Sequence, residues 1–219
     1  MDISENIQKY KEELPENVTL VAISKTKPVS ELMEAYNAGQ RIFGENKVQE
    51  MESKWQEMPK DVQWHMVGHV QRNKVKYMAP FVSLIHAVDS PRLLKEINKQ
   101  AKKVDRTIDC LLQIKIAEED TKFGLSEADA KELLASEAFQ NFGNVSVVGL
   151  MGMATFTDDE AQVRREFKNL NRIYDDFSKT HKNFSILSMG MSSDYTIAIE
   201  EGSNMVRIGS AIFGERNYN

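Results

Sequence analysis

The sequence has one cysteine, five prolines and no long apolar run, and each scarcity excludes a class of protein. Because Cys110 is alone, the chain can form neither an internal disulfide nor a thiolate-rich metal cluster, which fits a reducing compartment. Cys110 stands in an apolar run, so we expect it to be a small core residue. No stretch of 18 apolar residues could span a bilayer, and the N-terminus lacks the features of a secretion signal. We therefore expect a cytoplasmic protein without a membrane partner.

The sequence also lacks an excess of basic residues. It contains 28 Lys and Arg against 33 Asp and Glu, a net charge of -5. Binding to a phosphate backbone depends on a Lys and Arg excess, so nucleic acid is not the expected partner. No Pro-, Gly- or Ser-rich linker divides the chain, which predicts a single domain over residues 1–219.

What the sequence does contain is an alternation of short apolar runs with stretches whose apolar residues recur at helical spacing. The predicted strands are 20–23, 41–44, 62–68, 82–88, 108–116, 145–153, 184–189 and 205–213. Helix starts lie between them, at Pro28, at Ser90-Pro91, at Ser126 and at Thr157-Asp-Asp-Glu160. Eight βα units in 219 residues approach the lower size limit of a (β/α)8 barrel, about 200 residues.

The same alternation also permits a doubly wound open sheet. A barrel is favoured because unusual polar residues stand at the downstream ends of many different strands. They are Lys25, Asn46, His69, Asp89, Lys115, Thr155, Ser188 and Arg207. In a TIM barrel these ends converge on one mouth, where active sites of this fold lie. We therefore predict a single α/β barrel of the (β/α)8 type.

Lys25 ends the first apolar strand, Leu20-Val-Ala-Ile-Ser, at the predicted mouth. Burial of its stem would lower its pKa, and the neutral amine could then attack a carbonyl to form a Schiff base. An ordinary strand-end lysine that snorkels or pairs with a carboxylate is the alternative. Lys27 directly precedes Pro28 and is expected to be solvated or supporting.

The segments after the seventh and eighth predicted strands carry hydroxyls and glycines, in Ser188-Met-Gly-Met-Ser-Ser and in Gly209-Ser210. These loops form the recurring phosphate site of the barrel fold. Arg207, at the end of the eighth strand, must find a partner. One alternative is a salt bridge to Glu200, Glu201 or Glu45. The other is contact with the pyridine nitrogen of pyridoxal 5'-phosphate (PLP), whose phosphate would lie on Gly209-Ser210.

Five strings, in order and well spaced, resemble the YggS/PLPBP family of pyridoxal phosphate homeostasis proteins. They are Ala22-Ile-Ser-Lys-Thr-Lys-Pro28, Phe43-Gly-Glu-Asn-Lys-Val-Gln-Glu50, Trp64-His-Met-Val-Gly68, Leu187-Ser-Met-Gly-Met-Ser192 and Met205-Val-Arg-Ile-Gly-Ser-Ala-Ile-Phe-Gly214. The resemblance implies a barrel like the N-terminal domain of alanine racemase and other fold-type III PLP proteins, with PLP on Lys25. It also implies that Arg207 lies at the pyridine nitrogen and that Asn46 lies near the ring. Ser188, Met189, Ser192, Gly209 and Ser210 complete the cofactor site that the resemblance implies.

The resemblance further implies a monomeric carrier or buffer of PLP without established enzyme activity, with PLP-dependent apoenzymes as candidate recipients. A cation at the pyridine nitrogen disfavours its protonation, which weakens the ring as an electron sink. A racemase-like enzyme is the alternative, although it needs a second base, and Tyr195 is the only tyrosine close to a strand-end loop. A cofactor-free Schiff-base aldolase is a third hypothesis.

Several side chains have open roles in the sequence. Lys122 stands in Lys-Phe-Gly where many family members have Lys-Ser-Gly, and it could be a secondary amine for PLP transfer. His65 could line the PLP pocket or be a core histidine. No carboxylate cluster accompanies His65 and His69, so no metal site is predicted. Glu45 and Glu50 are expected to be surface charges.

Overall fold

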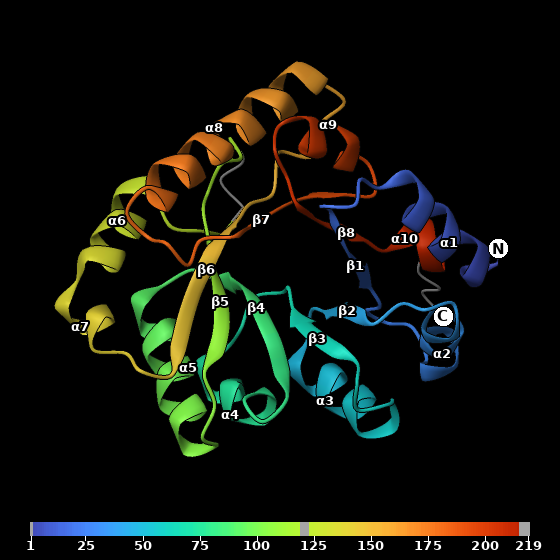
Figure 1. Ribbon diagram of the computed structural model, residues 1–219, viewed down its shortest axis with the longest axis horizontal. Coiled ribbons are helices and arrows are strands. Elements are labelled where there is room, and N and C mark those ends of the chain that lie inside the picture. The colour runs from blue at the N-terminus through green and yellow to red at the C-terminus, as the bar shows by residue number, and fades with distance from the viewer. Residues whose placement is uncertain (1, 119–122, 215–219) are drawn as a thin grey trace.

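The computed structural model describes residues 2–118 and 123–214, in which strands and helices alternate along the chain (Figure 1). The strands are β1 (Thr19–Ile23), β2 (Ile42–Glu45), β3 (Gln63–Met66), β4 (Val82–Val88), β5 (Ile108–Gln113), β6 (Val145–Met151), β7 (Ile186–Met191) and β8 (Met205–Ile208). The helices are α1 (Ile3–Glu13), α2 (Val29–Asn37), α3 (Val48–Glu57), η1 (Arg72–Lys74), α4 (Val75–Met78), α5 (Pro91–Lys103), α6 (Glu127–Ala135), α7 (Glu137–Gln140), α8 (Glu160–Ser178), α9 (Tyr195–Glu200) and α10 (Ser210–Phe213).

The eight strands form a closed parallel barrel in which each strand pairs with its neighbours in sequence. The barrel closes where β1 pairs with β8, with Leu20 opposite Val206 and Ala22 opposite Ile208. Helices surround the strands on the outside (Figure 1). The (β/α)8 prediction is confirmed, and the open-sheet alternative is wrong because an open sheet has no pairing between its first and last strands.

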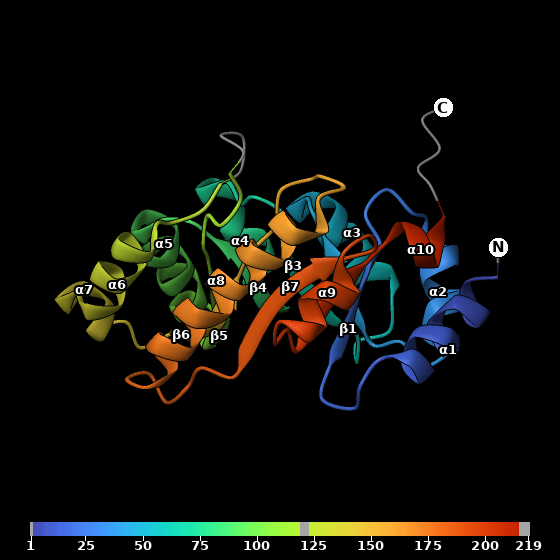
Figure 2. The ribbon, with the colours of Figure 1, turned by 90° about the horizontal axis from the view of Figure 1, so that it is seen from above.

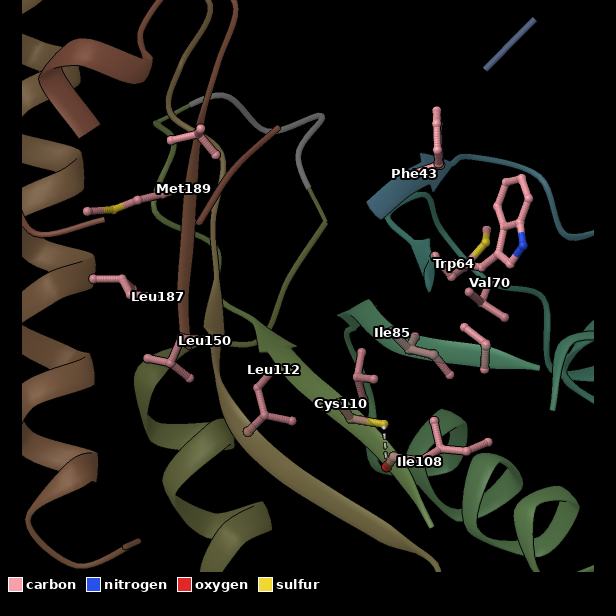
Figure 3. Close-up of a cluster of buried hydrophobic side chains, with 14 of the residues drawn as sticks. Phe43, Trp64, Val70, Ile85, Ile108, Cys110, Leu112, Leu150, Leu187 and Met189 are labelled. Carbon is pink, nitrogen blue, oxygen red and sulfur yellow. Dashed lines mark hydrogen bonds between the residues drawn. The ribbon is translucent and has the colours of Figure 1, made fainter. Parts of the chain in front are cut away.

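Side chains alternate between two apolar layers because successive residues of a strand point to opposite sides. On β1, Leu20 and Ala22 belong to the large layer between strands and helices, whereas Val21 belongs to the smaller cluster that fills the barrel. Cys110 lies in the outer layer, where its thiol donates to the Ile108 carbonyl oxygen at 3.7 Å (Figure 3). Burial raises the pKa of this thiol, so Cys110 is the core residue that the sequence predicts.

The largest boundary error concerns the eighth predicted strand, Met205–Phe213. The strand ends at Ile208, and Ser210–Phe213 form the helical turn α10. Gly209 leaves the extended conformation, with φ -124° and ψ -78°, and so turns the chain into this helix. The turn begins at the barrel mouth, two residues after Arg207.

The first helix, α1, is absent from the predicted pattern, which begins with the first strand. Its N-cap Asp2 accepts hydrogen bonds from the backbone N–H groups of Ser4 and Glu5. The helix lies beside α10 (Figures 1 and 2), and the side-chain amide of Asn6 donates to the Ile212 carbonyl oxygen at 3.0 Å. The two ends of the described chain are therefore joined through α1 and α10.

Two of the predicted helix starts have the expected caps, and one does not. Ser90 accepts from the N–H of Leu93, and Ser126 accepts from the N–H of Asp129. The N-cap of α8 is Asp159 rather than Thr157, whose hydroxyl instead accepts from the N–H of Asp159 at 3.2 Å. In the described residues, no helix combines the length and the apolar character needed to cross a bilayer.

Candidate functional site

A cavity of about 710 Å³ opens at the carboxyl ends of the barrel strands. Six of the eight residues predicted for the cofactor site line it: Lys25, Asn46, Ser192, Arg207, Gly209 and Ser210. These residues lie in or just after four different strands, so closure of the barrel is what brings them together. Lys27 and His69 line the same cavity.

Lys25 is half-buried and stands two residues beyond β1. The next residue, Thr26, has a φ of +66°, which a β-branched residue adopts only when its surroundings impose it. The N–H of Thr26 donates to Oε1 of Glu50 at 2.5 Å. The loop that carries Lys25 is thus held on its far side by a carboxylate of α3.

Glu50 belongs to a buried ionic cluster around Lys54. The Lys54 ammonium donates to the Ser24 carbonyl oxygen at 2.8 Å, to Oε1 of Glu45 at 2.7 Å and to Oε1 of Glu50 at 2.8 Å. Ser24 Oγ also donates to Oε1 of Glu45 at 2.6 Å. Glu45 is wholly buried, and burial raises the pKa of its carboxyl against the opposing effect of Lys54. The expectation of surface charge is therefore wrong for Glu45.

The loops after β7 and β8 form the wall of the cavity next to β1, because β8 pairs with β1. The N–H of Gly209 donates to the Ser192 hydroxyl oxygen at 3.3 Å, which ties the two loops together. A Cβ at Gly209 would lie 3.2 Å from Cβ of Ile23 and 3.3 Å from its carbonyl oxygen. Glycine therefore allows the turn after β8 to approach β1 closely. This wall therefore presents the hydroxyls of Ser192 and Ser210 to the cavity, and the backbone at Gly209 lies close to β1.

Arg207 lies in β8 and lines the cavity, although its side chain is almost fully buried. It donates to Oγ of Ser188 at 2.7 Å and to the Gly152 carbonyl oxygen at 3.1 Å, both neutral acceptors. Burial lowers the pKa of Arg207 to about 10, against the opposing effect of Asp194, so the guanidinium remains charged at neutral pH.

The salt bridge considered for Arg207 does not form. Glu200 and Glu201 pair with Arg164 at 2.6 Å each, and Glu45 pairs with Lys54. Within the described part of the chain, Arg207 is therefore a buried cation without a salt bridge.

Two residues of the predicted cofactor site lie outside the cavity lining. Ser188 is completely buried beneath Arg207. Met189 is also buried, and Figure 3 shows its side chain directed outward from β7 toward the neighbouring helix. Neighbouring residues of a strand alternate in direction, so the inward direction of Ser188 excludes Met189 from the interior. The sequence placed Met189 in the cofactor site, and its side chain instead packs in the outer apolar layer.

His65 is not a cavity-lining residue either. Its Nδ1 lies 3.0 Å from Nε2 of His86, and Nδ1 of His86 lies 3.0 Å from Oγ of Ser188. Burial lowers the pKa of His65 to about 3 and that of His86 well below its usual value, with His65 and Arg207 adding to the effect on His86. Both imidazoles are therefore neutral at physiological pH.

His65 should make the protein less stable in acid. In the unfolded chain its pKa returns to about 6.5, so between that value and about 3 only the unfolded state binds the proton. We expect stability to fall as the pH drops from 7.5 to 5.0, with His65 alone contributing about 2 kcal/mol of the loss. Urea unfolding at the two pH values measures it. The control, His65→Gln, cannot titrate, and an equal loss in the variant and the wild type would contradict the expectation.

The remaining rim of the cavity contains His69, one of the predicted strand-end residues. Nδ1 of His69 lies 3.0 Å from Oδ2 of Asp89, and its ring stacks on Phe123 at 5.1 Å. Asn46 lies beside Gly68, where a Cβ would come within 2.4 Å of the Asn46 carbonyl oxygen. Gly68 therefore lets the loops after β2 and β3 pack together at the mouth.

The other strand-end candidates do not line the cavity. Thr155 donates its hydroxyl to Glu166 at 2.7 Å, and Lys115 is exposed on the rim side of β5. Gln113, which the sequence analysis missed, does line the cavity and binds the Phe123 carbonyl oxygen at 2.9 Å. Lys122 lies outside the described residues. Among the described residues, no group of three or more His, Cys, Asp and Glu side chains could hold a metal ion.

A closed parallel barrel with a lysine, an arginine and glycine-serine turns at its carboxyl-terminal mouth defines a protein of the alanine racemase barrel class. The family model described as alanine racemase, N-terminal domain, matches residues 2–217. Curated relatives named pyridoxal phosphate homeostasis protein are more specific. The relative from Aquifex aeolicus is 40% identical over 202 residues, which is 91% of this chain and 87% of that protein. The relative from Escherichia coli is 38% identical over 211 residues, covering 93% and 88%. The chain belongs to the pyridoxal phosphate homeostasis protein family.

Solved structures agree with this assignment. PipY of Synechococcus elongatus, without PLP, matches with a TM-score of 0.91 and 33% identity, covering 97% of this chain and all of PipY. The structure described as PipY with PLP bound matches with a TM-score of 0.87 and 32% identity over the same shares. Alanine racemase from E. faecalis shares the fold, with a TM-score of 0.76 at 15% identity. The match covers 99% of this chain and 58% of that enzyme.

Proposed function

We propose that this protein binds PLP covalently through Lys25 and acts as a carrier or buffer in PLP homeostasis. The observation that carries the proposal is the convergence of Lys25, Arg207 and Gly209-Ser210 on one cavity. We further propose that residues 1–219 act as a single barrel domain and as a monomer, with PLP-dependent apoenzymes as recipients. The relatives named pyridoxal phosphate homeostasis protein, and the structure of PipY with PLP bound, support PLP as the ligand.

The residues present fit the cofactor. A cavity of about 710 Å³ is large enough for a molecule of this size, within the usual range for small-molecule sites. The hydroxyls of Ser192 and Ser210, which line the cavity, suit a phosphate group because they can donate hydrogen bonds to it. Arg207, whose direct partners are the neutral Ser188 and the Gly152 carbonyl, suits an uncharged ring nitrogen, which accepts a hydrogen bond. When bound, PLP supplies an aldehyde that reacts with a primary amine and a ring that withdraws electrons.

The chain's own residues favour holding the cofactor over catalysis. Arg207 cannot accept a proton, so it keeps a facing ring nitrogen unprotonated and limits the electron withdrawal that racemisation needs. Racemisation also needs a second base. Tyr195 is not part of the cavity lining, and its ring packs edge-to-face on Tyr10 with centroids 5.7 Å apart. We therefore propose a carrier, and enzymatic exchange of α-deuterium from amino acids would favour the racemase-like alternative instead.

Borohydride reduction of the protein with PLP, followed by peptide mass mapping, tests the proposal. We expect a new absorbance band on PLP addition and a pyridoxyl tag on the peptide that contains Lys25. A tag confined to other lysines, or no band at saturating PLP, would overturn it. Trapping with sugar phosphates but not with PLP would instead support the cofactor-free aldolase.

A further inference from the structure

Four polar residues form a continuous hydrogen-bonded chain across the inside of the barrel, and we call Arg207, Ser188, His86 and His65 the polar chord. Arg207 Nη1 lies 2.7 Å from Ser188 Oγ, which lies 3.0 Å from His86 Nδ1, and His86 Nε2 lies 3.0 Å from His65 Nδ1. The four residues belong to β8, β7, β4 and β3. In the strand order of the closed barrel, β3 and β4 lie opposite β7 and β8, so the chord crosses the interior.

The direction of the hydrogen bonds in the polar chord follows from its first member. A guanidinium only donates, so Ser188 Oγ accepts from Arg207. The Ser188 hydroxyl proton then has one acceptor in the chord, His86 Nδ1. His86 must carry its own proton on Nε2 and donate it to His65 Nδ1. Reversing the chord would leave the buried Ser188 proton without a partner in it, which costs about 1–3 kcal/mol.

The polar chord also preserves the charge of Arg207. At the position of Ser188, an aspartate would form a buried ion pair with Arg207 and neutralise it. In the polar chord, Arg207 instead donates to the Ser188 hydroxyl, which is hydrogen-bonded to His86 and through it to His65. All four residues are 5% exposed or less, so their polar groups depend on one another for hydrogen bonds. Arg207 is thus oriented by a neutral acceptor, while its charge remains available toward the cavity.

We infer that His86 and His65 are positioning residues that hold Ser188, and through it Arg207, in the orientation that meets the cofactor ring. This inference rests on the proposed function, because it concerns how Arg207 meets PLP. Neither histidine is among the residues that line the cavity. They act through the polar chord from the far side of the barrel.

The first experiment uses the PLP-free protein, so it does not depend on cofactor binding. Nitrogen-15 spectra of the histidine side chains report which ring nitrogen carries the proton. We expect His86 and His65 both to be neutral and protonated on Nε2. The Ser188→Ala variant should change the signals of His86. A wild-type His86 protonated on Nδ1 would overturn the direction of the chord.

The second experiment compares PLP affinity and the absorbance band of the complex. We expect His86→Phe and Ser188→Ala to weaken PLP binding about tenfold, the equivalent of one buried hydrogen bond, and to shift the band. His86→Asn places an amide oxygen near the Nδ1 position, so it should restore affinity to within about threefold of the wild type. The double variant should be no weaker than either single one, since both break the same chain.

Leu84→Val is the matched control. Leu84 fills the barrel interior on β4 two residues before His86, outside the polar chord. Its truncation should lower the melting temperature but leave the PLP affinity and the band unchanged. Folded His86→Phe and Ser188→Ala variants with wild-type affinity and spectrum would overturn the inference. Failure of the wild type to bind PLP would instead refute the proposed function, and the first experiment would still test the chord.

Discussion

Replacing Lys25 with alanine is expected to abolish the borohydride-fixed pyridoxyl tag and the absorbance band that PLP induces. The physical reason is that only a primary amine can form the covalent bond, and Lys25 stands where β1 opens into the cavity. Binding by the hydroxyls and glycine turns after β7 and β8 should persist, so the variant should still retain PLP, more weakly and without a covalent bond. Titration followed by absorbance and by equilibrium dialysis separates the two effects.

Two lysine variants serve as controls for Lys25→Ala. Lys47 is exposed beyond the cavity lining, so Lys47→Ala should keep the full tag. Lys27 lines the cavity, and its ammonium donates to the Phe213 carbonyl oxygen at 2.6 Å. Lys27→Ala should therefore keep the tag on Lys25 while loosening α10. A Lys25→Ala protein that retained the band would contradict the assignment of the covalent site.

Replacing Lys54 with methionine is expected to lower the free energy of unfolding by about 3–5 kcal/mol. The variant leaves the wholly buried carboxylate of Glu45 with Ser24 as its partner, and it also removes the support of the Ser24 carbonyl. Because Thr26 is held in its positive-φ conformation through Glu50, the loop that carries Lys25 should also loosen. Urea unfolding measures the stability loss.

Two further variants show whether the uncompensated charge causes the loss in Lys54→Met. The double variant Glu45→Gln with Lys54→Met removes the buried charge and should recover a large part of the stability. Lys9→Met breaks only an exposed pair with Glu13, whose atoms lie 3.8 Å apart, and should change stability little. A loss in Lys54→Met as small as that in Lys9→Met would show that Glu45 is not a compensated buried charge.

Local patterns predicted most of the secondary structure because each is decided within a few residues. The apolar runs located all eight strands, and Ser90 and Ser126 marked helix starts that the structure has. Strand boundaries were misplaced where an apolar run continues past the end of the strand. The run Met205–Phe213 stays apolar through a turn that Gly209 introduces, so hydrophobicity alone could not divide strand from helix.

Most of the residues that the sequence indicated for the cofactor site do line the cavity, because residues after parallel strands meet at one end of a barrel. Lys25, Asn46, Arg207 and Gly209-Ser210 could be proposed in this way. The direction of each side chain was harder to predict. Met189 stands next to Ser188, and only the register of β7 in the closed barrel decides which of the two points inward.

The sequence by itself determined a βα alternation long enough for one barrel, with a lysine, an arginine and glycine turns at strand ends, and its motifs indicated the family by resemblance. Only the tertiary structure decided how these residues are supported. His86 meets Ser188 across 102 positions of the chain, and Lys54 reaches Ser24 across 30. Such contacts leave no periodic trace in the sequence. The first exists because barrel closure brings inward side chains of β4 and β7 together, and the second because α3 packs beside the end of β1; in both, buried polar groups must find partners.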